Sequence, residues 1–188
     1  MQNIHTQLAV VGGGSAGVTA AISSARLGIP TVLITDRPVL GGNSSSEIRV
    51  WTRGATGAGN LWAEEMGIWG MLKLENLYRN PDANPVFWDE VLLDAVLREP
   101  NLTLWLNTVI YDVAMDGNRI TGLGGIQQGG EKVLFQAAAF IDATGDGCIG
   151  ALTGVPFTVG SDSRETLGSS ILYYTRQEDH PVPFVPPD

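Results

Sequence analysis

The sequence of 188 residues is poor in cysteine and in basic side chains. It contains a single cysteine, Cys148, which excludes both an intrachain disulfide and a Cys-x-x-Cys dithiol centre. The 11 Lys and Arg residues stand against 20 Asp and Glu residues, which gives a formal net charge of −9. Because a nucleic-acid partner needs a basic face to neutralise its phosphates, this balance predicts that no nucleic acid is bound.

Histidines and long apolar runs are scarce as well. The two histidines, His5 and His180, lie near the chain ends without metal-ligand spacing, so no metal site is expected. No stretch approaches the roughly 18 apolar residues of a membrane span, so no membrane partner is expected. Residues 1–7 carry no Lys or Arg before the first apolar run and do not resemble a signal peptide. These absences together predict a cytoplasmic protein.

Glycine, by contrast, is abundant, and one run reads Gly-Gly-Gly-Ser-Ala-Gly. It contains the pattern G-x-G-x-x-G at Gly12, Gly14 and Gly17. An apolar, strand-like segment (7–11) precedes the run, and a helical pattern (18–27) follows it, which is the context that a dinucleotide-binding fingerprint requires. The sequence therefore predicts a dinucleotide site at this turn.

Each glycine of the fingerprint has its own physical role. Gly12 permits the tight turn, Gly14 lets the backbone approach a pyrophosphate, and Gly17 lets the helix pack closely on the strand. A helix N-terminus offers unpaired N–H groups and a partial positive charge to phosphates. We therefore expect Ser15 and Ala16, which lie between the last two glycines, in the same site.

The remaining pattern predicts an α/β fold. Residues 31–35 are β-branched and apolar, as in a second parallel strand that a right-handed crossover joins to the first. A glycine-rich loop is expected at 36–60, and helices at 61–77 and 86–98. A short helix is expected at 148–153. Further short strands are predicted at 102–106, 109–115, 120–127, 132–136, 139–142, 157–159 and 169–175.

These elements predict a Rossmann-type parallel sheet with a β-meander insert. We expect a dinucleotide-binding domain over residues 1–154. Residues 155–188 are expected to be the incomplete start of a substrate domain, with a poorly ordered Pro-rich tail at 180–188.

The residue that ends the second strand of such a unit supplies a carboxylate for the ribose hydroxyls, about 20 residues beyond the fingerprint. Asp36 lies 24 residues after Gly12 and 19 residues after Gly17. Thr35 is the other candidate. Because neighbouring strand residues face opposite sides, the choice between them decides which side chain meets the ribose.

A second signal follows the predicted meander, where a strand runs into Asp142-Ala143-Thr144-Gly145-Asp146-Gly147. With this signal the chain resembles the FAD-dependent oxidoreductase family, among the flavoproteins with two dinucleotide-binding domains typified by glutathione reductase. The resemblance covers about residues 5–175 and rests on an ordered set of motifs, at 10–17, 36–43, 45–50 and 142–147.

The resemblance implies that FAD is the cofactor and that several further residues contact it. Gly41, Gly42 and Asn43 would lie along the pyrophosphate and ribityl chain. The backbone at Val109 would meet the adenine. Ala143, Thr144 and Gly145 would pass close to the cofactor, where small side chains are needed. Arg37, which follows Asp36, is also expected to contact the cofactor.

The sequence departs from the family pattern in two places. The usual acidic ribose position falls on Thr35, with Asp36 one residue later. Family members also carry a C-terminal Gly-Asp-type motif and most of a substrate domain beyond position 150, whereas this sequence stops at Asp188. The chain is therefore expected to be the N-terminal part of a longer protein.

Glu47 and Arg49 are the catalytic candidates, because the segment after Gly42 approaches the flavin ring in the family layout. If that segment is extended, the two side chains share a face. Arg49 would then bind a carboxylate substrate or stabilise reduced flavin, and the alternative is a structural ion pair that fixes the loop. Cys148 is expected to be inert and buried. Packing roles in the core or on a helix face are expected for the tryptophans at 62, 69, 88 and 105. Buried packing is expected for Trp51, and a position over the flavin or substrate is the alternative.

The predicted function is that of an FAD-dependent oxidoreductase. A hydride would pass between a small-molecule substrate and flavin N5, with an unidentified electron acceptor or donor completing the cycle. One alternative is an NAD(P)-binding Rossmann enzyme, against which the meander and the Ala-Thr-Gly signal argue. The other is a truncated, non-catalytic fragment of a flavoenzyme.

Overall fold

The computed structural model describes residues 2–160, 177 and 179–181. The chain divides into two compact units, Met1–Phe157 and Thr158–Asp188. The roles expected for residues 1–154 and 155–188 stay predictions. The first unit contains β1 (Gln2–Val11), α1 (Ser15–Arg26), β2 (Thr31–Ile34), a short 3₁₀ turn (Gly42–Ser44), α2 (Gly67–Arg79), α3 (Pro85–Leu97), β3 (Leu102–Trp105), β4 (Thr108–Asp116), β5 (Arg119–Gln127), β6 (Lys132–Asp142) and α4 (Cys148–Leu152).

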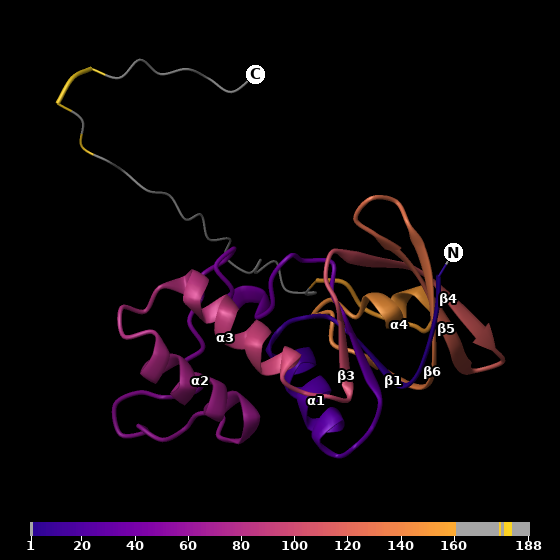
Figure 1. Cartoon of the computed structure of the whole chain (residues 1–188), viewed down its shortest axis with the longest axis horizontal. Helices are drawn as coiled ribbons and strands as arrows, with labels where there is room; N and C mark the ends of the chain where they lie inside the picture. Colours follow the sequence, from indigo (N-terminus) through magenta and orange to yellow (C-terminus); the bar gives the residue numbers. More distant parts are fainter. Residues whose placement is uncertain (1, 161–176, 178, 182–188) are drawn as a thin grey trace. The chain divides into compact units, whose positions relative to one another are not determined.

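The strands form one six-stranded sheet in the order β3-β2-β1-β6-β5-β4 (Figure 1). The first four strands in this order are parallel, and β5 and β4 join as antiparallel neighbours. Val11 pairs with both Ile34 of β2 and Asp142 of β6, so the carboxyl ends of three strands meet at one edge. The predicted fold class, a Rossmann-type sheet with a meander, is confirmed.

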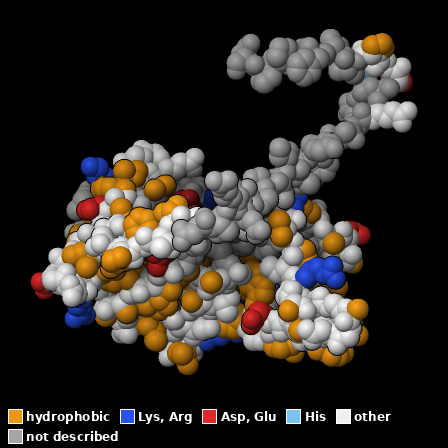
Figure 2. All heavy atoms as spheres, turned by 180° about the vertical axis from the view of Figure 1, so that it is seen from behind, with side chains coloured by type: hydrophobic (Ala, Val, Ile, Leu, Met, Phe, Trp, Pro, Cys, Tyr) orange, Lys and Arg blue, Asp and Glu red, His pale blue; other side chains and the backbone are white. Residues whose placement is uncertain are grey.

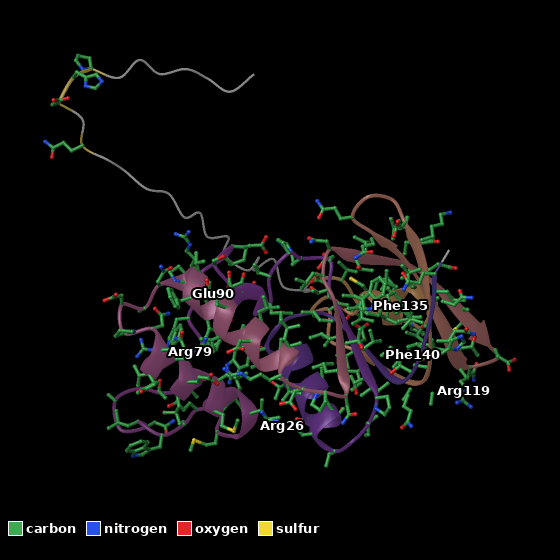
Figure 3. The ribbon with its side chains drawn as sticks, viewed as in Figure 1. Arg26, Arg79, Glu90, Arg119, Phe135 and Phe140 are labelled. Carbon is green, nitrogen blue, oxygen red and sulfur yellow. The ribbon has the colours of Figure 1, made fainter. Side chains whose placement is uncertain are left out.

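Both faces of the central strands are buried. Because successive side chains point to opposite sides of a sheet, each strand contributes to two separate cores. Val10 and Leu33 pack into a core with α1, α2 and α3, whereas Val11 and Ile34 pack into a second core with the meander and α4. In the second core Phe135 of β6 meets Trp105 of β3 edge-on, with ring centroids 5.3 Å apart. Figure 3 shows Phe135 on the meander side of the molecule, away from the α2–α3 helix pair.

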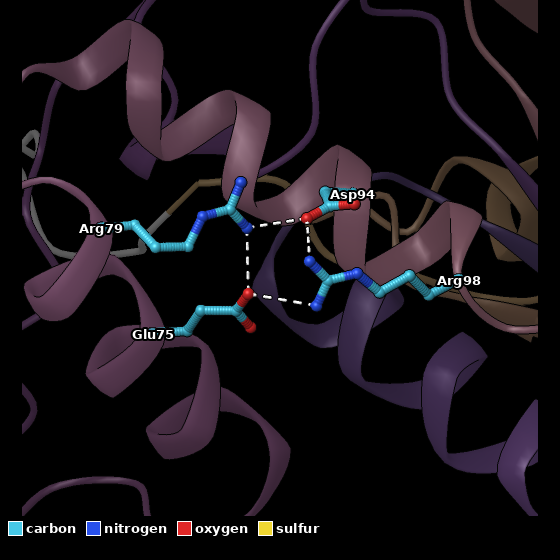
Figure 4. A network of polar contacts seen from close by, with 4 residues as sticks. All are labelled: Glu75, Arg79, Asp94 and Arg98. Carbon is cyan, nitrogen blue, oxygen red and sulfur yellow. Dashed lines mark hydrogen bonds and ion pairs between the residues drawn. The ribbon is translucent and has the colours of Figure 1, made fainter.

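The helix pair α2–α3 is joined by a partly exposed ring of four charged side chains (Figure 4). Arg79 contacts Glu75 at 2.9 Å and Asp94 at 2.7 Å, and Arg98 contacts the same two carboxylates. Elsewhere the surface carries many apolar side chains among sparse charges, as Figure 2 shows for one face. Over the described residues, no helix is both long and apolar enough to cross a bilayer.

Five expected elements differ from the structure. The strand predicted at 7–11 begins at Gln2, because its first residues pair with Val133–Ala137, and 132–142 form one strand where two were expected. The helix predicted at 61–77 begins only at Gly67, where its buried stripe of Trp69, Leu72 and Asn76 starts. Trp62 lies before this helix and is 87% exposed, so its expected packing role is wrong. No strand forms at 157–159.

The strand predicted at 169–175 lies outside the described residues, as does most of the Pro-rich tail.

Candidate functional site

A cavity of about 630 Å³ opens where β1, β2 and β6 end. Its lining comes from the glycine loop after β1, from the segment after β2, from the start of β4 and from the turn after β6. Gly17 is the one expected cofactor-binding residue that does not line it. The others do: Gly12, Gly14, Ser15, Ala16, Thr35, Asp36, Arg37, Gly41, Gly42, Asn43, Val109, Ala143, Thr144 and Gly145.

The three fingerprint glycines meet three different steric demands. Gly12 has a φ of +110°, and a Cβ on it would lie 2.2 Å from the backbone oxygen of Ala143. A Cβ on Gly17 would lie 1.8 Å from the backbone oxygen of Gly12, so α1 can approach the turn only if this residue lacks a side chain. A Cβ on Gly14 would meet nothing within 4 Å. The space beside Gly14 is therefore not filled by the protein and is open to a ligand.

The N-terminus of α1 supplies hydrogen-bond donors beside this space. The first hydrogen bond within α1 runs from the amide of Val18 to the oxygen of Gly14 at 3.0 Å. The amides of Ser15, Ala16 and Gly17 come before this bond and have no acceptor within the helix. Gly14 is the N-cap and offers no side-chain acceptor to these amides. Since a helix start also carries partial positive charge, this end of the cavity suits an anionic group such as a phosphate.

The segment after β2 lies directly against the glycine loop. The amide of Gly41 donates to the oxygen of Gly13 at 2.8 Å, and Gly14 and Gly41 form an isolated parallel bridge. Gly41 adopts a φ of +106°, and a Cβ on Gly42 would lie 3.2 Å from the Cα of Gly14. Two motifs that are about 25 residues apart in the sequence thus form one continuous wall.

The two candidate ribose residues lie in different surroundings. Thr35 is only 3% exposed, and its hydroxyl accepts the amide of Arg37 at 3.4 Å. Its backbone is held by Trp105 and Thr108, each through a bond of 2.9 Å. Asp36, one residue later, is exposed and lines the cavity. Both residues line the cavity, but of these two side chains the carboxylate is the exposed one.

The turn after β6 is organised by a carboxylate that sequence reasoning treated only as part of a motif. Asp142 accepts the amide and hydroxyl of Thr144 at 3.1 and 2.7 Å, and the amides of Ile149 and Gly150 at 2.9 and 3.0 Å. Partial burial would raise the pKa of Asp142, but the hydrogen bonds from Gly150, Thr144 and Ile149 outweigh it and lower that pKa overall. Asp142 therefore fixes the Ala143-Thr144-Gly145 turn at the cavity wall.

The catalytic candidates lie in a turn. The oxygen of Ser45 accepts the amides of Ile48 and Arg49, so residues 45–49 are not extended and the condition under which the two side chains would share a face is not met. Glu47 lines the cavity and pairs with Arg37 at 3.4 Å. Arg49 has a φ of +62°, donates to the oxygen of Ser46 at 2.8 Å and does not line the cavity.

Other aromatic and thiol groups divide between the core and the cavity. Trp88 is 1% exposed and packs edge-on against Trp69, as expected for core residues. Trp51 lies against Trp88 with ring centroids 5.8 Å apart but is 49% exposed, so its expected burial is wrong. Cys148 is exposed and lines the cavity, so the expected buried position is wrong.

Some residues that shape the site escaped the sequence reasoning. Ser44, Trp88 and Asp89 hold the loop that carries Gly41–Asn43, and only their three-dimensional contacts reveal this. Asp142 could have been suspected, because a negative charge close to the start of a helix is favourable for the amides of its first turn. Across the described part of the chain, no cluster of three or more His, Cys, Asp or Glu side chains could hold a metal ion.

Comparison with known proteins places this architecture among flavoproteins. Similar solved structures include a myxobacterial FAD-dependent chondrochloren halogenase, at 19% identity and a TM-score of 0.55 over 75% of this chain. They also include the E. coli quinol fumarate reductase, at 18% identity and 0.54 over 77%. A geranylgeranyl bacteriochlorophyll reductase-like protein from Thermoplasma acidophilum matches at 18% identity and 0.52 over 81%.

The chain spans only 37%, 33% and 43% of these three proteins, respectively. At such identities the likeness concerns the fold alone. The family itself is established by a family model, described as FAD dependent oxidoreductase, which matches residues 7–182. Since this match covers most of the sequence and the sheet has the flavoprotein arrangement, the chain belongs to the FAD-dependent oxidoreductase family.

Proposed function

We propose that the cavity at the carboxyl ends of β1, β2 and β6 binds FAD. The observation that carries this proposal is that the glycine loop, residues 41–43 and the 143–145 turn line one cavity. Its volume of about 630 Å³ lies within the range of cofactor sites. Gly14 and Gly145, with no atom near a built Cβ, leave the open surface that a bound dinucleotide needs.

Each wall of the cavity has a role in this proposal. The amides that begin α1 receive the pyrophosphate. This local cluster of donors allows an anion to bind despite the overall negative charge of the protein. Asp36 accepts the ribose hydroxyls, because its carboxylate is exposed at the cavity whereas Thr35 is buried. The backbone around Val109, which follows the Thr108 amide bonded to Thr35, meets the adenine.

A bound FAD would supply the redox chemistry, the exchange of a hydride between its N5 and a carbon of a small-molecule substrate. The chain contributes binding and orientation. Glu47 is the catalytic candidate that reaches the cavity, and its contact with Arg37 orients its carboxylate there. An electron acceptor or donor of unidentified class completes the cycle, and cytoplasmic location stays a prediction from the sequence.

The first test is whether the purified chain retains FAD through gel filtration. Absorbance bands near ~450 and ~370 nm that co-elute with protein support the proposal. A colourless product, or retention of NAD in place of FAD, contradicts it.

A matched pair of variants then tests the ribose assignment by fluorescence titration with FAD. Asp36→Asn should raise the Kd for FAD about tenfold, because a charge-assisted hydrogen bond is lost. Thr35→Val should change that Kd by less than about twofold, since the Thr35 side chain is buried whereas that of Asp36 is exposed. The reverse ranking would assign the ribose to Thr35.

A further inference from the structure

Helix α3 lies outside the dinucleotide-binding motifs, yet three of its residues contact the loop that forms one wall of the cavity. Trp88, Asp89 and Leu92 face residues 41–46. A Cβ built on Gly41 would lie 2.9 Å from Leu92, which shows how closely this loop approaches the helix. Trp88 and Leu92 are fully buried, and Asp89 is 8% exposed. The contact is therefore part of the core rather than a surface feature.

A directed chain of hydrogen bonds runs from the helix to the glycine loop. An indole can only donate, and Trp88 Nε1 donates to Ser44 Oγ at 3.0 Å. Because the oxygen of Ser44 accepts this bond, its own O–H points to another acceptor and donates a hydrogen bond to the oxygen of Gly41 at 2.9 Å. The amide of Gly41 in turn donates to the oxygen of Gly13 at 2.8 Å.

A second link holds the same loop two residues further on. The amide of Ser46 donates to Asp89 Oδ1 at 2.9 Å. Residues 44 and 46 are therefore tied to adjacent positions of one rigid helix. The wall formed by Gly42 and Asn43 lies between the anchored oxygen of Gly41 and these two ties. A loop held at both ends keeps its backbone ready for a ligand, which lowers the entropic cost of binding.

We propose that Trp88 and Asp89 are positioning residues that set the register of residues 41–46 against the glycine loop and thereby set the affinity for FAD. The affinity part rests on the proposed FAD site. The register part concerns the chain alone, so the two can fail separately.

The test combines FAD titration with hydrogen–deuterium exchange of peptides spanning residues 40–47 in the FAD-free chain. Trp88→Phe removes the indole donor, and Ser44→Ala removes the next link with a much smaller loss of volume. Each variant should raise the Kd for FAD and speed exchange in this segment about fivefold, as expected for one lost hydrogen bond. The double variant should lose no more than Ser44→Ala alone, because both changes break one chain.

Two further variants sharpen the test. Asp89→Ala should act like Trp88→Phe but should add to Ser44→Ala, because it removes the acceptor of the Ser46 amide, which is a separate link. Trp105→Phe is the matched control: it removes an indole of the other core whose buried N–H has no partner among the described residues. It should leave exchange at 40–47 and the Kd for FAD unchanged.

The outcomes separate the proposals. Unchanged exchange in Trp88→Phe and Ser44→Ala would overturn the positioning role. Faster exchange with an unchanged Kd would overturn the link to affinity. A wild-type chain that takes up no FAD would overturn the proposed function, while the exchange data still decide whether α3 sets the loop.

Discussion

The turns that follow β1 and β6 leave neighbouring parallel strands and border the same cavity, but they are held in different ways. After β1 the conformation depends on missing side chains. Gly12 and Gly17 sit where a Cβ would collide with the backbone of Ala143 and Gly12, respectively. After β6 the glycines face open space, and one carboxylate, Asp142, gathers the amides around it.

This difference separates the functions of the two turns. The amides that begin α4 are used internally, because Cys148 donates to Thr144, and Ile149 and Gly150 donate to Asp142. The N-terminus of α1 has no such side-chain cap. Only the first turn therefore keeps donors available for an external anion. The second turn contributes shape and small side chains to the cavity wall.

The steric requirement of the first turn predicts the largest effect. Gly17→Ala would place a methyl group 1.8 Å from the oxygen of Gly12, which can be relieved only if α1 moves away from β1. We expect a loss of more than about 3 kcal/mol in the free energy of unfolding, from overpacking at the strand–helix contact. Urea denaturation followed by circular dichroism measures it. A variant with the wild-type midpoint would show that the helix is not held at this distance.

Removal of the carboxylate tests the second turn. Asp142→Asn replaces an acceptor of several donors by an amide whose N–H₂ faces them, so we expect the free energy of unfolding to fall by about 2 kcal/mol. The lowered pKa of Asp142 in the folded chain means that its contribution is complete above the ordinary value of 3.8 and is lost as the pH falls through the lower, folded pKa.

The difference between wild type and Asp142→Asn should accordingly be constant near neutral pH and shrink below about pH 4. Denaturation curves at several pH values follow this trend. A difference that grows on acidification would mean that Asp142 does not act as the ionised cap of this turn.

Gly14→Ala separates ligand space from packing space within the first turn. A methyl group here meets no protein atom within 4 Å, and the φ of −71° suits alanine, so the unfolding midpoint should stay close to wild type. The same methyl enters the space assigned to the pyrophosphate, and we expect the Kd for FAD to rise at least about tenfold. Tight binding by a folded Gly14→Ala chain would place the pyrophosphate elsewhere.

Local sequence signals predict some parts of the site and not others. Glycine spacing is a local signal, so the first turn and the βαβ unit could be predicted from residues 7–35. The turn at 45–49 could not, because its geometry follows from the bonds that tie Ser44 and Ser46 to α3, more than 40 residues away. The sequence alone predicts a loop over 36–60 and leaves open whether Glu47 and Arg49 share a face.

The error at the start of α2 has a related cause. Apolar spacing extended the predicted helix back to residue 61, and Trp62 fitted the pattern. Spacing does not report whether a core is within reach, and only from Gly67 onward does α2 bury side chains, beginning with Trp69. Periodicity predicted the helix, while its first residue depended on a tertiary contact.

The charged ring between α2 and α3 predicts the smallest effect, because it lies outside both turns. Arg79→Gln removes the contacts to Glu75 and Asp94, but Arg98 still bridges both carboxylates. The hydrogen bond from Arg79 lowers the pKa of Asp94, and this contribution is present above the ordinary carboxylate pKa and lost as the pH falls through the lowered one. In an exposed network such a contact is screened by solvent and salt. We expect a small decrease in melting temperature that disappears in high salt, and an unchanged Kd for FAD. If the Kd changed instead, the α2–α3 pair would be coupled to the cavity through α3, and the contribution of Trp88 and Asp89 to the loop would depend on how this ring holds their helix.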